Sequence, residues 1–441
     1  KIMKLRKCYL DRNLMKFLFK IILVVIFSLS INESKANTLF DSLNLAYLNN
    51  PKLNAQRANM RATREEKRES VSEFLPSVVI SGYTGEQENT NPGDDTNFRP
   101  SEHSLTIEQK IFQGGSGIAN FKKKKYGQNI GEFKLKKTEQ EILLEAAKAH
   151  TELLLNRKKV NINLINVDLF ERQVETDQNR LEKGEINLTD LSQSESSLAG
   201  ARAELIAAEN DLVTSKANFE KIIGKKLTGD IQEIEKINLN LPESLATAYR
   251  ISNSENPDLQ IAQMEYEQSK LDVAIAGSEL SPSATLSYKI AEQDDISSTV
   301  QERTQQTVTA TATWSLFAGG KNTFNYRKFQ EIENQKELLL EDRKKTTKTE
   351  VANAWSSYQS SKSMLDSIRS QVKAAEIANE GITLEYESGG SRTTLEVIQS
   401  RSILLNSSIN FASSERNFLI SQFNLLSAVG RLTANHLNLK Q

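Results

Sequence analysis

The alternation of apolar and polar residues predicts two pairs of β-strands, one pair in each half of the chain. The predicted strand at 307–317 (TVTATATWSLF) alternates without interruption from Thr307 to Leu316, which is the period-2 pattern of a strand with one apolar face. Similar patterns predict three further strands near 77–85, 104–112 and 283–291. The segments between the strands of each pair are polar and are predicted to be loops.

A Gly-Gly pair follows the second strand of each pair, at Gly114 and Gly115 and again at Gly319 and Gly320. Glycine adopts backbone conformations that other residues avoid, so it suits an abrupt change of chain direction. We therefore expect these four glycines to form the joints between strands and helices.

Apolar residues that recur every seven positions predict long helices in most of the remaining sequence. One such series occupies 146–181, the next 191–219, and a third lies at 397–425. Proline is absent from 101–241 and from 283–441. Because proline interrupts helices, its absence leaves room for very long ones.

The same plan occurs twice along the chain. Asn50-Pro51 recurs as Asn256-Pro257, and the Gly-Gly pairs recur at nearly the same separation of 205 or 206 residues. Each copy is predicted to run helix, strand, polar loop, strand, long helix, turn, long helix. We predict a signal peptide at 1–36, a first structural repeat at 37–230, a linker at 231–242 and a second structural repeat at 243–441, the two repeats forming one interleaved domain.

The first 36 residues have the organisation of a secretory signal peptide. Residues 1–20 are basic, residues 21–31 (IILVVIFSLSI) are apolar, and Ser34 and Ala36 offer small side chains for cleavage. Cleavage after Ala36 removes eight basic and two acidic residues, so the formal net charge changes from -1 to -7. A mildly acidic chain gives no reason to expect a nucleic-acid partner.

The residues that metal or cofactor chemistry requires are scarce and scattered. The single cysteine, Cys8, lies in the predicted signal peptide, and His103, His150 and His436 are far apart. This spacing does not suit a metal site or a histidine-based catalytic group. We expect no cofactor and no enzymatic activity.

The lengths of the predicted elements point to a membrane protein. Strands of nine to eleven residues can cross a bilayer, and a membrane admits sheets only as closed barrels. Four strands are too few to close, since known barrels begin at about eight. The chain must therefore oligomerise, and three copies would supply twelve strands. A helix from Gly115 to about Lys183 would extend roughly 100 Å and must project into an aqueous compartment.

In its motifs the chain resembles the TolC-type outer-membrane channels of Gram-negative bacteria. The resemblance covers nearly the whole mature chain and is carried by SLNLAYLNNPKL, LEKGEINLTDLSQSES, YESGGSRTTLEVIQS and LLSAVGRL. It implies a mainly α-helical membrane protein with long antiparallel coiled-coil helices and four transmembrane strands per chain. It also implies a homotrimer in the outer membrane, whose 12-stranded β-barrel continues as a helical tunnel through the periplasm.

The same resemblance implies an exit duct of a tripartite efflux or type I secretion system. Its partners would be a periplasmic adaptor, an inner-membrane pump of the ABC or RND type, and the lipid of the outer membrane. The alternative is a trimeric outer-membrane adhesin or a porin-like protein without pump partners. An adhesin is expected to keep its strands consecutive at the C-terminus, and a porin needs at least eight strands in one chain.

The resemblance further implies that two helix–helix turns, at 184–191 and 389–397, form a periplasmic tip that closes the duct and receives the adaptor. The residues that match the family's gate are Thr189, Asp190, Tyr386, Arg392, Glu396 and Gln399. The residues expected at the adaptor-docking tip are Gly184, Leu188, Gly389, Gly390 and Thr393.

Local helix chemistry offers a different interpretation of the same turn residues. Thr393 and Glu396 have the spacing of a capping box, and Asp190 could be the N-cap of a helix. Arg392 and Glu396 are also spaced as an i,i+4 surface pair.

Overall fold

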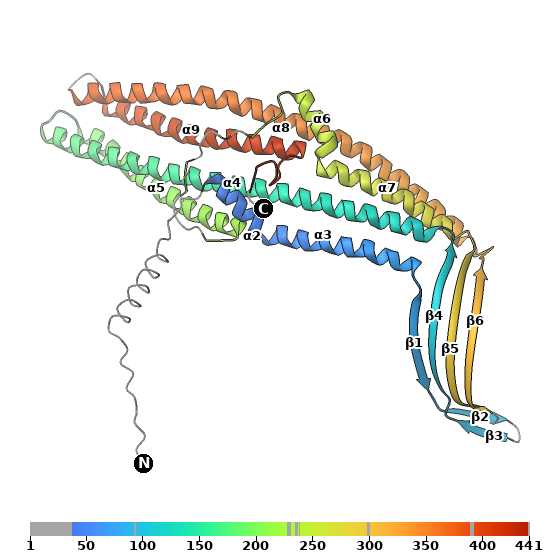
Figure 1. The fold of residues 1–441 in the computed structure, drawn as a ribbon. Coiled ribbons are helices and arrows are strands. Elements are labelled where there is room, and N and C mark those ends of the chain that lie inside the picture. The colour runs from blue at the N-terminus through green and yellow to red at the C-terminus, as the bar shows by residue number, and fades with distance from the viewer. Residues whose placement is uncertain are drawn as a thin grey trace, which may run out of the picture.

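The chain forms a long helical body with a β-sheet at one end (Figure 1). This computed structural model describes residues 38–91, 94–226, 231–233, 237, 239–297, 300–388 and 392–439. The predicted signal peptide at 1–36 lies outside the described residues. The boundaries of the two repeats and of their linker stay predictions.

Both halves of the chain contain the same order of main elements. The first half comprises α2 (Leu39–Asn49), α3 (Pro51–Glu69), the 3-10 helix η1 (Ser70–Phe74), β1 (Ser77–Thr84), β4 (Ser101–Gln113), α4 (Ser116–Glu182) and α5 (Leu188–Ile223). The second half comprises α6 (Leu245–Glu255), α7 (Pro257–Ser278), β5 (Ser283–Ser297), β6 (Val300–Thr313), α8 (Lys321–Glu387) and α9 (Thr394–Val429). Helices α4 and α8 contain 67 residues each, so each extends about 100 Å. The predicted fold class, mainly long helices with a four-stranded sheet, is confirmed.

The main sheet has the strand order β1-β4-β5-β6, and its three strand pairs are antiparallel. Within the described residues, β1 pairs with β4 alone and β6 with β5 alone. These two strands are therefore the edges of the sheet, and each presents a row of backbone groups to a further strand.

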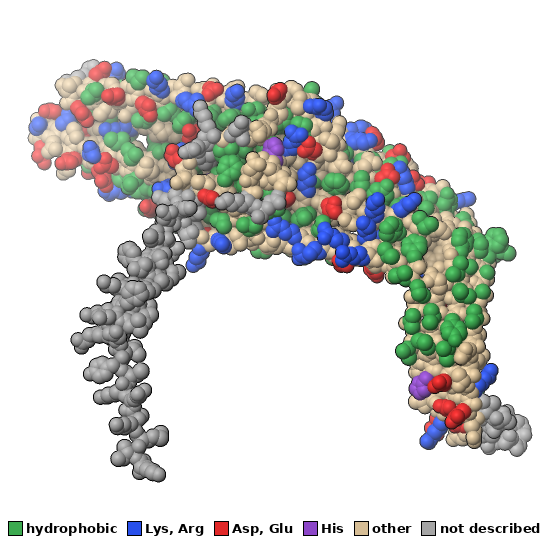
Figure 2. Space-filling view, in the orientation of Figure 1, with side chains coloured by type: hydrophobic (Ala, Val, Ile, Leu, Met, Phe, Trp, Pro, Cys, Tyr) green, Lys and Arg blue, Asp and Glu red, His purple; other side chains and the backbone are tan. Residues whose placement is uncertain are grey.

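One face of the main sheet is apolar. A row of paired residues crosses all four strands on this face: Val78, Ile107, Tyr288 and Val308. Val78 and Val308 are 61% and 70% exposed in the single chain. Figure 2 shows hydrophobic side chains gathered over the sheet. Side chains alternate between the faces of a strand, so the opposite face carries the ion pair between Lys289 Nζ and Glu102 Oε1, 2.6 Å apart.

The structure corrects both predicted loops and several strand boundaries. The segment between the first two predicted strands, expected to be a loop, contains a hairpin of β2 (Gln87–Asn91) and β3 (Asp94–Phe98). In the second pair, β5 continues to Ser297 and β6 begins at Val300, so most of the segment 292–306, expected to be a loop, is paired strand.

The fourth strand was predicted to reach residue 317, but β6 ends at Thr313. Thr313 pairs with Ser283, the first residue of β5, so no partner residues remain for Trp314 onward. The alternation continues there without a neighbouring strand.

The main core lies around the middle of α4, where α2, α5, α9 and the C-terminal segment meet. Its most enclosed side chains include Leu43, Leu143 and Phe423, each 0% exposed, and Phe219, 2% exposed. A second cluster joins α6, α8 and α9. None of the helices in the described part of the chain combines the length and apolar character needed to cross a lipid bilayer. Across the same residues, no group of three or more His, Cys, Asp and Glu side chains is arranged to hold a metal ion.

The Gly-Gly pairs lie between strand and helix with backbone angles that glycine favours. φ is 60° at Gly114 and 86° at Gly115, and 64° at Gly319 and 84° at Gly320. Gly114 also packs closely: a Cβ there would lie 2.7 Å from the carbonyl oxygen of Ser278, whereas a Cβ at Gly319 would meet nothing within 4 Å.

Alanine substitution at these glycines is expected to separate backbone strain from steric conflict. Gly319→Ala should lower the free energy of unfolding by about 1–2 kcal/mol, because alanine disfavours the left-handed backbone conformation that glycine adopts there. Gly114→Ala adds a clash with backbone and should lower the thermal unfolding midpoint further. Circular dichroism of the two purified variants in detergent checks this order, and equal midpoints would contradict it.

Candidate functional site: the helical tip

Two helix–helix turns lie together at the end of the helical body farthest from the sheet (Figure 1). We call this end the tip, meaning the turn between α4 and α5 (183–187) and, between α8 and α9, the described residues Ser388, Arg392 and Thr393. Gly389 and Gly390, expected in the adaptor-docking tip, lie outside the described residues.

Local backbone chemistry forms the first turn. Gly184 has φ of 74°, and the N–H of Glu185 donates to the carbonyl of Arg180 at 2.9 Å, which ends α4. Asn187 is the N-cap of α5, because its side chain accepts from the N–H of Asp190 at 3.0 Å. The interpretation of Asp190 as the N-cap is therefore wrong. Asp190 is the third residue of the helix and completes a capping box by accepting from the N–H of Asn187.

The second turn contains a capping box and two ion pairs. Thr393 caps α9, and its N–H donates to Glu396 Oε2 at 2.8 Å, as the capping-box interpretation predicted. Arg392 donates to Glu385 at 2.7 Å and to Glu396 at 3.0 Å, so the predicted i,i+4 pair is present. The hydrogen bond that Arg392 donates to Glu385, and then the one it donates to Glu396, raise the pKa of its guanidinium. The N–H of Thr393 and then Arg392 lower the pKa of Glu396.

Arg392 and Asp190, two of the gate residues matched by resemblance, do not bond each other inside one chain. Arg392 bonds carboxylates of its own helical hairpin, and Asp190 bonds Asn187. Thr189 and Gln399 are exposed, and Leu188 is 67% exposed. A gate contact between Arg392 and Asp190 therefore stays a prediction.

Tyr386 lies elsewhere, in a buried polar cluster just behind the turns. Its side chain is 2% exposed, and its hydroxyl donates to Asp177 Oδ1 at 2.6 Å and lies 3.0 Å from Thr394 Oγ1. Asp177 is 0% exposed and also accepts from Ser194 and, at 2.9 Å, from Gln173. The Asp177 carboxylate of α4 thus accepts hydrogen bonds from α5 and α8. The Tyr386 hydroxyl extends this network to Thr394 of α9.

Two arginines support the cluster. The guanidinium of Arg180 lies 4.5 Å from the centre of the Tyr386 ring, a cation–π geometry. Burial, followed by the hydrogen bond to Asp177, raises the pKa of Tyr386, so its hydroxyl remains a donor. Arg401 of α9 is 6% exposed and donates to the carbonyl of Leu169 of α4 at 2.9 Å. The four helices are therefore joined by directional bonds that separation of the hairpins would break.

Sequence reasoning missed most of this cluster, namely Gln173, Asp177, Arg180, Ser194, Thr394 and Arg401. A signal for Asp177 is nevertheless present. Within the seven-residue pattern of α4, Val167, Phe170 and Val174 occupy the inward positions, and Asp177 occupies the next one. An acidic residue at an inward position is costly unless it is hydrogen-bonded, so it marks a buried polar contact.

The family model of the outer membrane efflux proteins matches residues 42–225 and again 248–431. The chain belongs to this family. The two matched stretches cover both halves of the described fold, and the resemblance to the TolC-type channels is confirmed.

Curated relatives and solved structures agree with this assignment. The chain is 24% identical over 413 residues to the outer membrane efflux protein BepC of Brucella suis, covering 92% of this chain and 88% of BepC. It is 23% identical over 421 residues to the outer membrane protein TolC of Vibrio cholerae, covering 90% and 92%. The solved structure of the CmeC outer membrane channel of Campylobacter jejuni has the same fold, with a TM-score of 0.81 at 14% identity, covering 90% and 86%.

The family establishes the general function and location. The protein is an outer-membrane exit channel of the efflux and type I secretion class, with a helical extension into the periplasm. This favours the predicted exit duct over the alternative of an adhesin or a porin-like protein. Members of the family are transport channels, and they work with adaptors and inner-membrane pumps.

Proposed function

We propose that three copies of this chain form one closed duct, and that the tip described above is its gate. The observation that carries the proposal is the pair of free edges, β1 and β6, on a four-stranded sheet with an apolar face. Pairing β6 of one chain with β1 of the next satisfies both edges. Three chains then supply twelve strands, enough for a membrane barrel whose apolar face contacts outer-membrane lipid.

At the tip, Arg392 is the residue best placed to join neighbouring chains. Its guanidinium is part-exposed and already held in position by Glu385 and Glu396. In the closed trimer it would bond Asp190 or Thr189 of an adjacent chain, because a guanidinium offers several directional donors. Glu396 and Gln399, one turn apart on α9, would line the constriction. One carboxylate per chain there favours the passage of cations.

The docking of the periplasmic adaptor is the proposed trigger for opening. Leu188 and Thr393 are exposed at the two turns, beside Gly184, so an adaptor can contact both hairpins of one chain. Contacts that favour the open arrangement shift the equilibrium away from the closed one. An inner-membrane pump of the ABC or RND type would deliver the substrate.

Arg392→Ala is expected to raise the resting conductance of the purified channel in planar bilayers. The substitution removes the proposed contact between chains but leaves the capping box of Thr393 and Glu396 in place. Arg369→Ala, which removes an exposed ion pair with Asp366 on α8, is a matched control and should leave the conductance unchanged.

The same preparation tests the oligomer. The parent protein in detergent should have the mass of three chains. A monomer in detergent would contradict the trimer, whereas a trimer with unchanged Arg392→Ala conductance would contradict the role of Arg392.

A further inference from the structure

Equivalent asparagines of the two halves make equivalent internal contacts. The side-chain amide of Asn50 donates to the carbonyl of Ile222 at 2.9 Å, and that of Asn256 donates to the carbonyl of Ala428 at 2.9 Å. Helices α4 and α8 have equal lengths, as do α5 and α9. The two halves can therefore be aligned residue by residue. Each residue of α4 corresponds to the residue of α8 that lies 205 positions later, and each residue of α3 corresponds to the residue of α7 that lies 206 positions later.

The half of the helical body near the sheet is a layer in the order α3-α4-α7-α8, as its contacts show. This order follows that of the strands, β1-β4-β5-β6. Within one chain, the two halves meet where α4 packs against α7. In the aligned halves, α4 corresponds to α8 and α7 corresponds to α3. The same packing between two chains would therefore place α8 of one chain against α3 of the next.

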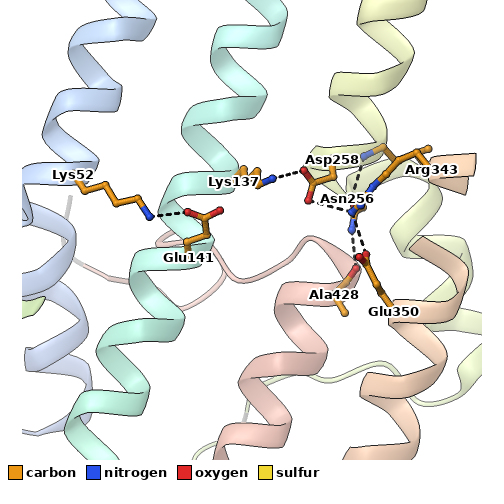
Figure 3. A network of polar contacts seen from close by, with 9 residues as sticks. Lys52, Lys137, Glu141, Asn256, Asp258, Arg343, Glu350 and Ala428 are labelled. Atoms are coloured by element: carbon orange, nitrogen blue, oxygen red, sulfur yellow. Dashed lines mark hydrogen bonds and ion pairs between the residues drawn. The ribbon is translucent and has the colours of Figure 1, made fainter. Parts of the chain in front are cut away.

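Ion pairs hold α4 to α7. Lys137 Nζ lies 2.7 Å from Asp258 Oδ1, and Lys123 pairs with Asp272. Asp258 also contacts Arg343 of α8 at 3.2 Å. Figure 3 shows Asp258 between its two cations, and on the other side of α4 it shows Lys52 bound to Glu141. The junction between the halves is thus an aspartate of α7 shared by two basic residues.

The residues that correspond to Lys137 and Asp258 in the other half each carry the opposite charge. Lys137 maps onto Asp342 of α8, and Asp258 maps onto Lys52 of α3. Both signs are reversed, so the attraction is kept. Lys52 already contacts Glu141 of its own α4 at 3.0 Å, just as Asp258 contacts Arg343. A second anion from a neighbouring α8 would complete the same three-residue arrangement with inverted charges.

The ion pair between Lys123 and Asp272 also has a pair of one basic and one acidic residue at the corresponding positions. Lys123 maps onto Lys328 of α8, and Asp272 maps onto Glu66 of α3, with the signs unchanged. Glu66 contacts Lys124 of its own chain at 3.0 Å, so it too would be shared by two basic residues.

The outer face of α8 is open to such a partner in the single chain. Lys328 and Asp342 are exposed and lie 14 residues apart, on the same face of the helix. Phe324 and Leu338 lie four residues before each of them and are 65% and 63% exposed. Charged and apolar side chains therefore alternate along one stripe of α8.

We propose that α8 of one chain docks against α3 of the next copy through two ion pairs, Asp342 with Lys52 and Lys328 with Glu66. Phe324 and Leu338 are covered in this contact. The proposal rests on the trimer proposed above and names the contact that orders its chains.

The contact is confined to the half of the helical body near the sheet. Farther along, Lys158 of α4 pairs with Glu415 of α9 at 3.1 Å. The repeat maps these two residues onto Ser363 and Glu209, which cannot form an ion pair. The repeat therefore does not extend the proposed ion pairs to this part of the helical body.

Charge exchange between chains tests the proposal. Asp342→Lys and Lys52→Asp should each make the trimer dissociate roughly tenfold faster on heating in detergent, because each replaces three attractions by three repulsions. The double variant should recover most of the parent rate. Glu141→Gln, which removes only the bond of Lys52 inside its own chain, controls for the loss of that bond and should have the smaller effect.

Cross-linking distinguishes a wrong contact from a wrong oligomer. With Lys52→Cys and Asp342→Cys in one chain, a short bismaleimide should give covalent trimers on a denaturing gel. Lys52→Cys with Asp366→Cys, displaced by 24 residues along α8, should give none. Trimers by mass without the 52–342 link, or single-charge variants as stable as the parent, overturn the contact but leave the trimer intact. Monomers by mass overturn both.

Discussion

Asp177→Ala is expected to raise the resting conductance of the channel more than any other single substitution at the tip. The carboxylate accepts from Tyr386, Ser194 and Gln173 in a fully enclosed position. Removing it leaves buried donors without their acceptor, which costs about 3 kcal/mol in total. If half of that free energy is lost from the closed arrangement alone, the equilibrium shifts about tenfold towards the open arrangement.

A double-mutant cycle measures whether Asp177 acts through the tyrosine. Tyr386→Phe removes the donor and should raise the conductance by itself, and the double variant should then show much less than the sum of the two effects. Asp168→Ala is the matched control, since Asp168 lies on the same helix in an exposed ion pair with Arg172. Full additivity in the cycle would show that the bond between Tyr386 and Asp177 does not hold the tip closed.

Acidification is expected to destabilise the helical core through His150. This histidine is 0% exposed; its Nδ1 lies 2.8 Å from Ser42 Oγ, and its Nε2 has no hydrogen-bond partner among the described residues. Burial lowers the pKa of His150 from its ordinary value of 6.5 to about 4, against a weaker opposing effect of Asp41. The remaining face of the ring packs beside Phe219, which carries no charge.

The sign of the pH effect follows from the lowered pKa. Between about pH 6.5 and pH 4 the unfolded chain binds a proton at this position and the folded chain does not. The stability that the neutral ring contributes is therefore complete above pH 6.5 and is lost as the pH falls towards 4. The full loss is about 3 kcal/mol.

Unfolding by denaturant at several pH values checks this prediction. His150→Asn keeps a group that can bond Ser42 but does not titrate, so its free energy of unfolding should fall less steeply than that of the parent between pH 6.5 and 4. Parallel curves for the parent and His150→Asn would contradict the assignment.

Periodicity predicted the main elements well, because it records which face of an element is buried. The seven-residue spacing predicted α4, α5 and α9, and alternation predicted all four strands of the main sheet. It failed at Trp314 and Leu316, where alternation continues beyond Thr313, the partner of the first residue of β5. It also failed for polar segments that pair through their backbone, namely the hairpin of β2 and β3 and the adjoining ends of β5 and β6, because such pairing leaves no apolar pattern.

In the candidate site, too, the sequence predicted the local contacts but not those between distant residues. The capping box of Thr393 and Glu396 and the pair of Arg392 with Glu396 are local, so three or four positions of sequence were enough to predict them. The bond between Tyr386 and Asp177 spans 209 positions, and nothing in either local stretch specifies its partner.

By itself, the amino-acid sequence determined the duplicated plan, the long helices, the strands and the glycine joints, because each depends on neighbouring residues or on a fixed period. Only the tertiary structure decided which polar side chains meet. It placed Asp177 inside the tip, Tyr386 against it, and Lys137 against Asp258 across the junction of the two halves. Such contacts join distant residues, and their strength depends on burial and geometry that exist only after the helices have packed.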